Sequence, residues 1–187
     1  MRFFTLVVCA VLFAACSRKE PSSPKDIVLT TADGARGELS TLAARAPFTV
    51  VVFISAECPC LHAHLGRLRE LANTFGPRGV QFLAVDSEVG ASPARAKETQ
   101  ADLELPFPVL VDPGARLAEA FGAEYATFTV IVDRALNVRY RGGIDSDKRK
   151  MHDGATPYVR EALDDLLAGR PPRRTEGKAL GCVLRKW

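Results

Sequence analysis

The sequence predicts an α/β fold in which a central mixed sheet is flanked by helices within a single domain. Apolar, largely β-branched runs at 48–55, 80–87, 107–112 and 128–133 are typical of strands buried on both faces. Stretches with helical spacing separate these runs, as in a sheet that helices cover on both sides. The 187 residues are 47% hydrophobic and 25% charged, which suits one globular domain with its own core.

The first half of this domain combines two helices with the strands. A strand that ends at the Asp33-Gly34 turn precedes a short helix over 38–46. A longer helix begins after the strand at 48–55, and the Gly76-Pro77 pair ends it. The apolar residues of the longer helix recur at helical spacing on one stripe: Leu61, Leu65, Leu68, Ala72 and Phe75.

The second half is expected to end in a hairpin and a helix. The last helix takes Thr156 as its N-cap and Pro157 as its first residue, and it runs to Ala168 with Gly169 as the capping residue beyond it. The domain is therefore expected to span 26–169. The other elements after residue 90 are predicted at 94–103 (helix), 115–122 (short helix) and 138–144 (strand).

Residues 1–15 have the pattern of a secretory signal peptide, because Arg2 precedes an apolar run that is too short to span a bilayer. The stretch Phe13-Ala14-Ala15-Cys16 resembles a bacterial lipobox, in which cleavage leaves a lipidated cysteine as the new N-terminus. An ordinary signal peptide is the alternative, since Phe13 stands where the lipobox prefers Leu. We expect an exported, membrane-anchored lipoprotein that faces the periplasm or cell exterior, with a polar tether over 16–25 and its contact with the lipid membrane through acylated Cys16.

The C-terminal segment 170–187 is expected to be a basic, solvated tail, with contact to anionic lipid headgroups as the less favoured alternative. The formal net charge of the chain is +3, too close to neutral to predict a nucleic-acid partner. The basic residues of the tail face one acidic residue, Glu176: Arg170, Arg173, Arg174, Lys178, Arg185 and Lys186.

The five cysteines reduce to three in the expected mature domain. Cys9 leaves with the signal peptide, and Cys16 is acylated. Cys58, Cys60 and Cys182 remain. An odd number of cysteines in an exported protein indicates that at least one thiol is kept available for catalysis, a metal or an outside partner.

Five stretches of the chain resemble the redoxin branch of the thioredoxin superfamily, which includes alkyl hydroperoxide reductases and thiol-specific antioxidants. The resemblance implies a thioredoxin-like α/β fold and a thiol oxidoreductase activity at a reactive cysteine. It extends over nearly the whole exported domain. The matching stretches are "VVVFISAECP", "GVQFLAVDS", "LPFPVLVDP", "FGAEYATFTVIVDRALNVRYRGG" and "GCVLRKW".

Cys58 occupies the junction of the first core strand with its following helix, where the resembled family carries its reactive cysteine. Pro59 suits the first helical position, which makes Cys58 the N-cap, and free backbone N–H groups there stabilise a thiolate. His62, one turn on, would help if it were protonated. The sequence Ser55-x-x-Cys58-Pro59 also matches the Thr/Ser-x-x-Cys-Pro core of the peroxiredoxin signature.

Three positions depart from the subfamilies. Peroxiredoxins usually carry a proline where this chain has Val51, and disulfide reductases carry a second cysteine where it has Leu61. The cis-proline of the thioredoxin fold would fall near Thr127, and this chain has no proline there. Neither subfamily's motif is complete, so the sequence predicts generic thiol redox chemistry.

Two cysteines are candidates for the disulfide partner of Cys58. Cys60 lies two residues on, and in a regular helix such side chains point about 200° apart, so a bridge would need the first turn to unwind. Cys182 follows Gly181 on a tail that we expect to be mobile, and it reaches Cys58 without distorting the helix. Cys182 is therefore the preferred resolving thiol and Cys60 the second choice.

A metal site is the alternative interpretation of this stretch, and it would make the protein a copper or zinc metallochaperone. At a spacing of two, four residues of one helix cannot meet one ion unless the turn opens, although Cys182 or His152 could complete a two-ligand site. The preferred prediction is no metal and no cofactor, with each histidine at the surface. The four candidate ligands are Cys58, Cys60, His62 and His64.

Taken together, the sequence predicts that the Cys58 thiolate attacks a protein or small-molecule disulfide, or a peroxide. Cys182, Cys60 or an external thiol then resolves the intermediate, and an external thiol supplies the electrons. Thiol peroxidase is the second enzymatic prediction.

Overall fold

The computed structural model describes residues 23–186 of the chain. The predicted signal peptide, the Cys16 lipidation site and most of the tether lie outside these residues, and they stay predictions. Within the described residues, no helix is both long and apolar enough to cross a membrane.

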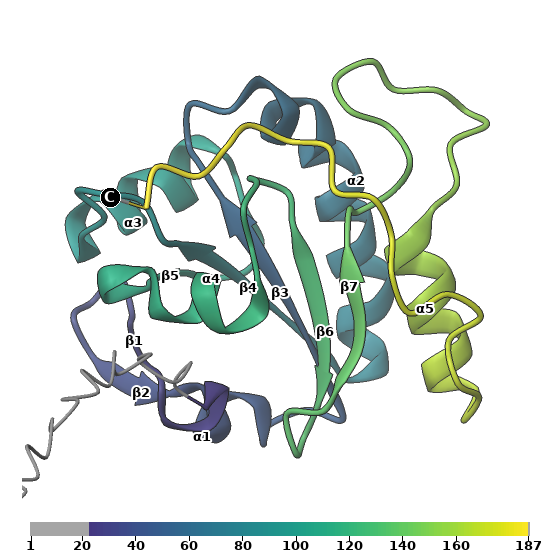
Figure 1. Ribbon diagram of the computed structural model, residues 1–187, viewed down its shortest axis with the longest axis horizontal. Helices are drawn as coiled ribbons and strands as arrows, with labels where there is room; N and C mark the ends of the chain where they lie inside the picture. Colours follow the sequence, from purple (N-terminus) through teal and green to yellow (C-terminus); the bar gives the residue numbers. More distant parts are fainter. Residues whose placement is uncertain (1–22, 187) are drawn as a thin grey trace, which may run out of the picture.

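A seven-stranded mixed sheet forms the centre of the protein, in the order β2-β1-β5-β4-β3-β6-β7 (Figure 1). β3, β4 and β5 run parallel, and the other pairs are antiparallel. This arrangement confirms the predicted mixed α/β sheet. The strands are β1 (Val28–Thr30), β2 (Arg36–Glu38), β3 (Phe48–Ile54), β4 (Val80–Asp86), β5 (Val109–Val111), β6 (Thr129–Asp133) and β7 (Val138–Gly142).

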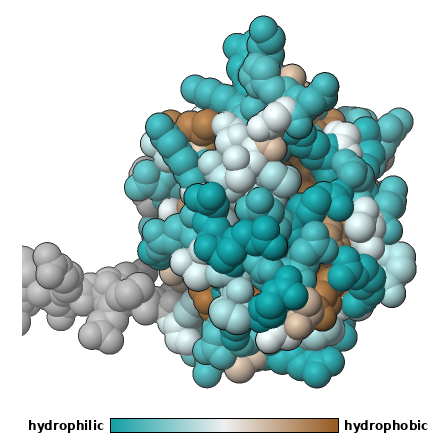
Figure 2. Space-filling view, turned by 90° about the vertical axis from the view of Figure 1, so that its right-hand side faces the viewer, coloured by the Kyte–Doolittle hydropathy of each residue, from teal (hydrophilic) through white to brown (hydrophobic). Residues whose placement is uncertain are grey.

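Five α-helices flank the sheet. α2 and α5 lie side by side in Figure 1, and the ion pair between Arg160 of α5 and Glu70 of α2, 2.7 Å long, joins them. The face on this side of the molecule is largely hydrophilic, with apolar atoms in small separate patches (Figure 2). The helices are α1 (Leu39–Ala43), α2 (Pro59–Phe75), α3 (Pro93–Asp102), α4 (Arg116–Phe121) and α5 (Tyr158–Leu167), with short 3-10 helices at Pro24–Asp26, Gly76–Arg78 and Pro113–Ala115.

The core strands β3 and β4 are buried because their residues are almost continuously apolar. From Thr49 to Ile54 every residue of β3 is buried, and β4 has only Gln81 partly exposed. Parallel strands covered by helices on both faces need such composition. Because β3 and β4 are parallel, their carboxyl ends lie at the same end of the sheet. The loops that follow these two strands carry Cys58 and Glu88.

Two local predictions are wrong. The strand β2, which pairs with β1 in a hairpin, was not expected, because its residues are exposed at the sheet edge and show no apolar pattern. α5 begins at Tyr158, so Thr156 is not its N-cap. The backbone N–H of Thr156 instead donates to the Ser146 hydroxyl, and the Thr156 carbonyl accepts from the Ser146 N–H. The expected cap at Gly169 is confirmed by its φ of +71°.

The C-terminal segment, residues 170–186, packs against the domain and is called the docked tail below. In Figure 1 it runs in yellow from α5 across the top of the sheet. Arg170 and Arg173 pair with Asp165, at 2.7 and 2.9 Å, and Arg185 pairs with Glu88 at 3.2 Å. The expectation of a mobile tail is therefore wrong, because acidic side chains of the domain pair with several of its arginines. The paired arginine side chains are still more than half exposed to solvent.

Candidate functional site

Cys58 lies where β3 passes into α2. Its backbone is extended, with φ −75° and ψ 115°, and Pro59 is the first residue of the helix. The Cys58 N–H donates to the Ser55 carbonyl at 3.0 Å, and its own carbonyl accepts from the His62 N–H at 3.1 Å. Cys58 is thus the N-cap that the sequence predicts, with its sulfur beside the free N–H groups of the first turn.

The docked tail places Cys182 directly against Cys58. The two Sγ atoms lie 2.7 Å apart, although the cysteines are 124 positions apart in the sequence. Both thiols are free. Cys58 is buried, with 2% of its surface exposed, whereas Cys182 is partly exposed. The structure therefore brings together the two cysteines that the sequence favoured as a pair.

Backbone pairing holds Cys182 in this position. The Cys182 carbonyl accepts from the Ala126 N–H at 2.8 Å, and Val183 forms an antiparallel bridge with Tyr125. The N–H of Leu184 donates to the Glu124 carbonyl at 2.9 Å, and the Leu184 side chain is buried. The tail thus behaves at this point as a short added strand.

Gly181 allows the close approach of the tail. A Cβ atom at this position would overlap the carbonyl oxygen of Ala126 and lie 3.3 Å from the Thr127 hydroxyl. Thr127 is buried and has a φ of +74°, and its N–H donates to the Phe53 carbonyl at 2.8 Å. Thr127 therefore lies beneath the Gly181-Cys182 segment, at the position where the resembled family carries its cis-proline.

The pKa values of Cys58 and Cys182 move in opposite directions. Burial by itself raises the pKa of Cys58, but hydrogen bonds from the Cys182 thiol and from the backbone N–H groups of Leu61, Cys182 and Cys60 hold it below the ordinary value. Burial and the hydrogen bond donated to Cys58 raise the pKa of Cys182 to about 11. Of the two, Cys58 therefore gives up its proton more readily, and Cys182 retains its proton.

Cys60 adds a third sulfur. The ligand atoms of Cys58, Cys60 and Cys182 all lie within 4.8 Å of one another. The 200° divergence expected between the two cysteines of the turn does not hold, because the extended N-cap residue is outside the helical geometry. Burial, and then the nearby charge of Cys58, raise the pKa of Cys60.

Ser55 points away from the sulfurs. Its hydroxyl donates to the Glu88 carboxylate at 3.0 Å. Burial by itself raises the pKa of Glu88, but hydrogen bonds from Arg185 and Ser55 hold it below its ordinary value. Arg95 approaches the same carboxylate at 3.4 Å. Glu88 therefore anchors the tail, a role that sequence reasoning missed, although an acid directly after the buried strand was a visible signal.

The two histidines of α2 are turned away from the sulfurs. The Nε2 atom of His62, which is exposed, contacts the Ala56 carbonyl at 2.7 Å. His64 is buried: its Nδ1 contacts the Cys60 carbonyl at 2.7 Å, and its Nε2 contacts Asp145 at 3.2 Å. The four-residue metal set expected from the sequence is thus not assembled, and the surface position expected for His64 is wrong.

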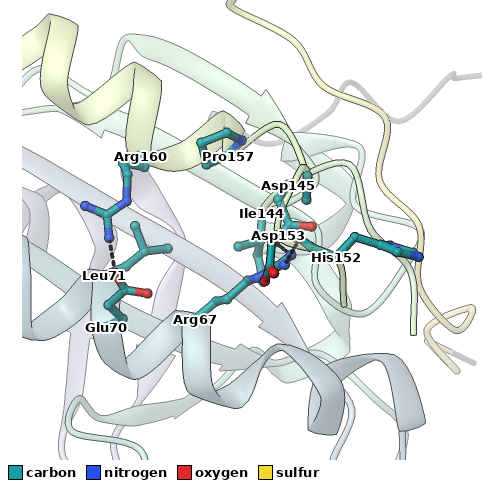
Figure 3. Close-up of a pocket in the computed structure, with 10 residues that line it drawn as sticks. Arg67, Glu70, Leu71, Ile144, Asp145, His152, Asp153, Pro157 and Arg160 are labelled. Atoms are coloured by element: carbon teal, nitrogen blue, oxygen red, sulfur yellow. Dashed lines mark hydrogen bonds and ion pairs between the residues drawn. The ribbon is translucent and has the colours of Figure 1, made fainter. Parts of the chain in front are cut away.

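A second polar cluster extends from His64 to the loop before α5. Arg67 of α2 pairs with Asp145 at 2.7 Å (Figure 3). Arg67 also pairs with Asp147 at 2.9 Å, and His152 contacts Asp147 at 2.9 Å. Arg67, Asp145 and His152 line a cavity of about 230 Å³ between α2, α5 and the loop before α5. No partner of His152 was predicted from the sequence, although Asp147 lies only 5 positions before it. The Arg67–Asp145 pair joins residues 78 positions apart and leaves no local pattern.

Comparisons place the chain among known proteins. Residues 23–141 match the family described as AhpC/TSA family. None of the curated proteins compared with the chain matches it. An uncharacterized conserved protein from Geobacillus kaustophilus is 33% identical in sequence, with a TM-score of 0.76 over 86% of this chain and 88% of that one.

Two further solved structures share the fold at lower identity. A thioredoxin-like protein from Aeropyrum pernix is 23% identical, with a TM-score of 0.51 over 64% of this chain and 81% of that one. The bacterioferritin comigratory protein of Xanthomonas campestris, described with an alkyl peroxide reduction activity, is 17% identical, with a TM-score of 0.55 over 80% of this chain and 92% of that one. The predicted thioredoxin-like fold is confirmed.

Proposed function

The chain belongs to the AhpC/TSA family and is therefore a thiol oxidoreductase or thiol peroxidase, and from this premise we propose that Cys58 and Cys182 are its redox pair. The observation that carries the proposal is the 2.7 Å approach of the two sulfurs. One of them is stabilised as a thiolate and the other held as a thiol. The pair is thus divided into a nucleophile and a resolving group before any substrate arrives.

Reduction of a substrate disulfide follows from this division. The Cys58 thiolate attacks one sulfur of the substrate, a mixed disulfide forms, and the first substrate thiolate leaves. Cys182 gives up its proton and attacks the Cys58 sulfur, which releases the second substrate thiolate. The product is a Cys58–Cys182 disulfide, and two electrons have passed to the substrate, which leaves as two thiols once protonated.

Burial of Cys58 favours a peroxide as the second candidate substrate. With 2% of its surface exposed, Cys58 admits a small oxidant more readily than a folded protein. The Cys58 thiolate would attack one peroxide oxygen, forming a sulfenic acid and releasing an alkoxide that takes up a proton. Cys182 would then attack the sulfenic sulfur and release water, giving the same disulfide.

Electrons return through the more exposed sulfur. An external thiolate that attacks Cys182 displaces Cys58, and a thiol with a lowered pKa is the better leaving group. A second external thiol then releases the first from Cys182 as a disulfide. Cys182 is thus the point where the proposed thiol reductant docks, and Cys58 is the point where the oxidant is reduced.

The place of this chemistry is proposed from the sequence. Residues 1–15 and the stretch ending at Cys16 support export and lipid anchoring outside the cytoplasm. Replacing Cys16 with Ala is expected to move the protein from the membrane fraction to the soluble fraction. Retention of the variant in the membrane fraction would contradict the anchor.

The redox proposal is tested with the full chain and matched variants. Wild type, Cys58→Ser, Cys182→Ser and Cys60→Ser are assayed for reduction of hydroxyethyl disulfide, insulin and cumene hydroperoxide. We expect Cys58→Ser to be inactive and Cys182→Ser to lose turnover, while Cys60→Ser retains the Cys58–Cys182 disulfide in mass mapping. Undiminished activity of Cys58→Ser would overturn the proposal.

A further inference from the structure

Cys60 has no task in the proposed two-cysteine cycle, yet it is buried beside the redox pair. Its exposed fraction is 2%, the same as that of Cys58. The Cys60 sulfur lies within 4.8 Å of the sulfurs of both Cys58 and Cys182. Three convergent thiols from two separate segments of the chain form a soft donor set, and such sets select soft metal ions.

The spacing of the sulfurs suits a single ion. A metal–sulfur bond of about 2.3 Å around one metal requires sulfurs about 4 Å apart. The three sulfurs lie within 4.8 Å of one another, which allows this spacing. The sulfurs of Cys58 and Cys182, 2.7 Å apart, would have to separate. Cys182 can supply this movement, because it is partly exposed on the tail, whereas Cys58 and Cys60 are fixed at the start of α2.

We propose that the reduced protein binds one Cu(I) ion through the Sγ atoms of Cys58, Cys60 and Cys182. The site differs from the set expected in the sequence analysis, since it takes a thiol of the docked tail in place of the two histidines. It also goes beyond the redox cycle and does not require it. No copper chemistry enters the reduction of a disulfide or peroxide proposed above.

The number of donors favours Cu(I) over Zn(II). Within residues 23–186, the His/Cys/Asp/Glu group able to surround an ion contains these three sulfurs and no fourth ligand. His62 and His64 are engaged with the Ala56 carbonyl and with Asp145. Zinc in a structural site takes four ligands, whereas three thiolates satisfy a soft monovalent ion.

The surroundings partly offset the charge of three thiolates. The N-terminus of the 17-residue helix α2 directs its N–H groups at Cys58, and Lys148 lies close enough to lower the pKa of Cys60 against the effect of burial. Each ligand cysteine must bind as a thiolate, so protons are released when the ion binds. Affinity is therefore expected to rise with pH.

Copper binding and disulfide formation exclude each other. The Cys58–Cys182 disulfide removes two of the three donors, so the oxidised protein is expected to release the ion. The two proposals can also fail separately. Activity is assayed without copper, and copper binding is assayed on fully reduced protein without oxidant.

The test uses the full chain with Cys9 and Cys16 replaced by Ser, so that the three proposed ligands are its only thiols. Anaerobic, reduced protein is titrated with Cu(I) against bicinchoninate. We expect one ion per chain and three sulfur ligands by X-ray absorption. Cys60→Ser is expected to weaken binding by roughly 100-fold or more, since even the outer partners of ligands contribute about 10- to 100-fold.

His62→Asn is the matched control, because it removes an exposed donor from the same helical turn and is expected to leave Cu(I) affinity unchanged. The melting temperature of each variant reports whether it folds, and the sulfur count on the parent chain needs no variant at all. Three results would overturn the proposal: no ion retained against the chelator, two sulfur ligands with Cys60→Ser unchanged, or tighter binding of Zn(II) than of Cu(I).

Discussion

One hydrogen bond explains much of the difference between the two proposed redox cysteines. The hydrogen bond between the Cys58 and Cys182 thiols lowers the pKa of Cys58 while it raises the pKa of Cys182. A cysteine with a lowered pKa is the more readily ionised nucleophile. In the proposed mechanism, the docked tail therefore activates Cys58 as well as supplying its resolving thiol.

Removing that donor is expected to raise the pKa of Cys58. In Cys182→Ala the side-chain hydrogen bond between residue 182 and Cys58 is lost, whereas the hydroxyl in Cys182→Ser can still donate. The pH dependence of Cys58 alkylation by iodoacetamide, followed by peptide mass mapping, should move to higher pH in Cys182→Ala and move less in Cys182→Ser. Equal profiles for wild type and Cys182→Ala would show that the contact does not stabilise the thiolate.

The buried His64–Asp145 pair is expected to make stability depend on pH. Burial by itself lowers the pKa of His64, but the hydrogen bonds to Asp145 and to the Cys60 carbonyl raise it above its ordinary value of 6.5, against the opposing charge of Arg67. A histidine with a raised pKa contributes its full stabilisation below 6.5. The contribution is lost as the pH rises through the pKa of the folded state.

The measurement compares urea unfolding of wild type with His64→Gln at about pH 5.5 and about pH 8.5, both far above the range in which Asp145 titrates. The advantage of wild type should be larger at the lower pH. Asp145→Asn is the second variant, and it should lose most of this pH dependence. An advantage that is constant, or that grows with pH, would contradict the assignment of the charge to His64.

At the residue scale, the sequence was informative where a local rule applied. Pro59 after Cys58 marks an N-cap, and the structure has that cap. The position of Glu88 after a buried strand was a visible signal, but its pairing with Arg185 was not predictable. The same holds for the contacts of Arg67 and His64 with Asp145, since these partners lie 78 to 97 positions away. The roles of the cysteines stay proposals.

At the scale of elements, the docked tail is the feature that the sequence least indicated. Its short backbone pairing with Glu124–Ala126 has no alternating apolar pattern, and its basic composition is typical of solvated segments. The burial of Leu184, the packing of Gly181 on Ala126 and the arginine pairs with Glu88 and Asp165 contribute to its docking together with this pairing. Long buried strands such as β3 and β4 were predicted to within one residue, because burial on both faces demands continuous apolar sequence.

Gly181→Ala is expected to disturb the docked tail without altering the core. The added methyl group would overlap the Ala126 carbonyl, so the segment that carries Cys182 must move away. Formation of the Cys58–Cys182 disulfide after a pulse of oxidant should slow by roughly 10- to 100-fold, the usual cost of misplacing a reacting group by about 1 Å.

Gly154→Ala is the matched control for this experiment, because a Cβ atom at Gly154 has no neighbour within 4 Å. Its rate of disulfide formation should equal that of wild type. If Gly181→Ala also forms the disulfide at the wild-type rate, close packing of the tail is not what positions Cys182.

For the whole molecule, the sheet and its helices follow from the sequence pattern, whereas the closure of the chain onto its own N-terminal half does not. The tail returns over the sheet and brings Cys182 to a helix that begins 123 positions earlier, at Pro59. The Cys58–Cys182 contact exists only when the whole domain is folded. Oxidation of these two cysteines is therefore linked to the stability of the whole domain.

Oxidation is therefore expected to stabilise the protein. The Cys58–Cys182 bond closes a loop between residues 124 positions apart, and such a cross-link typically raises the free energy of unfolding by about 2 to 4 kcal/mol, by restricting the unfolded chain. Urea unfolding of the full chain with Cys9 and Cys16 replaced by Ser, oxidised and reduced, measures this difference. The same comparison in Cys60→Ser should give the same increase in the free energy of unfolding, and in Cys182→Ser it should give none. An oxidised protein that unfolds at the same urea concentration as the reduced one would show that this bond does not join the tail to the domain.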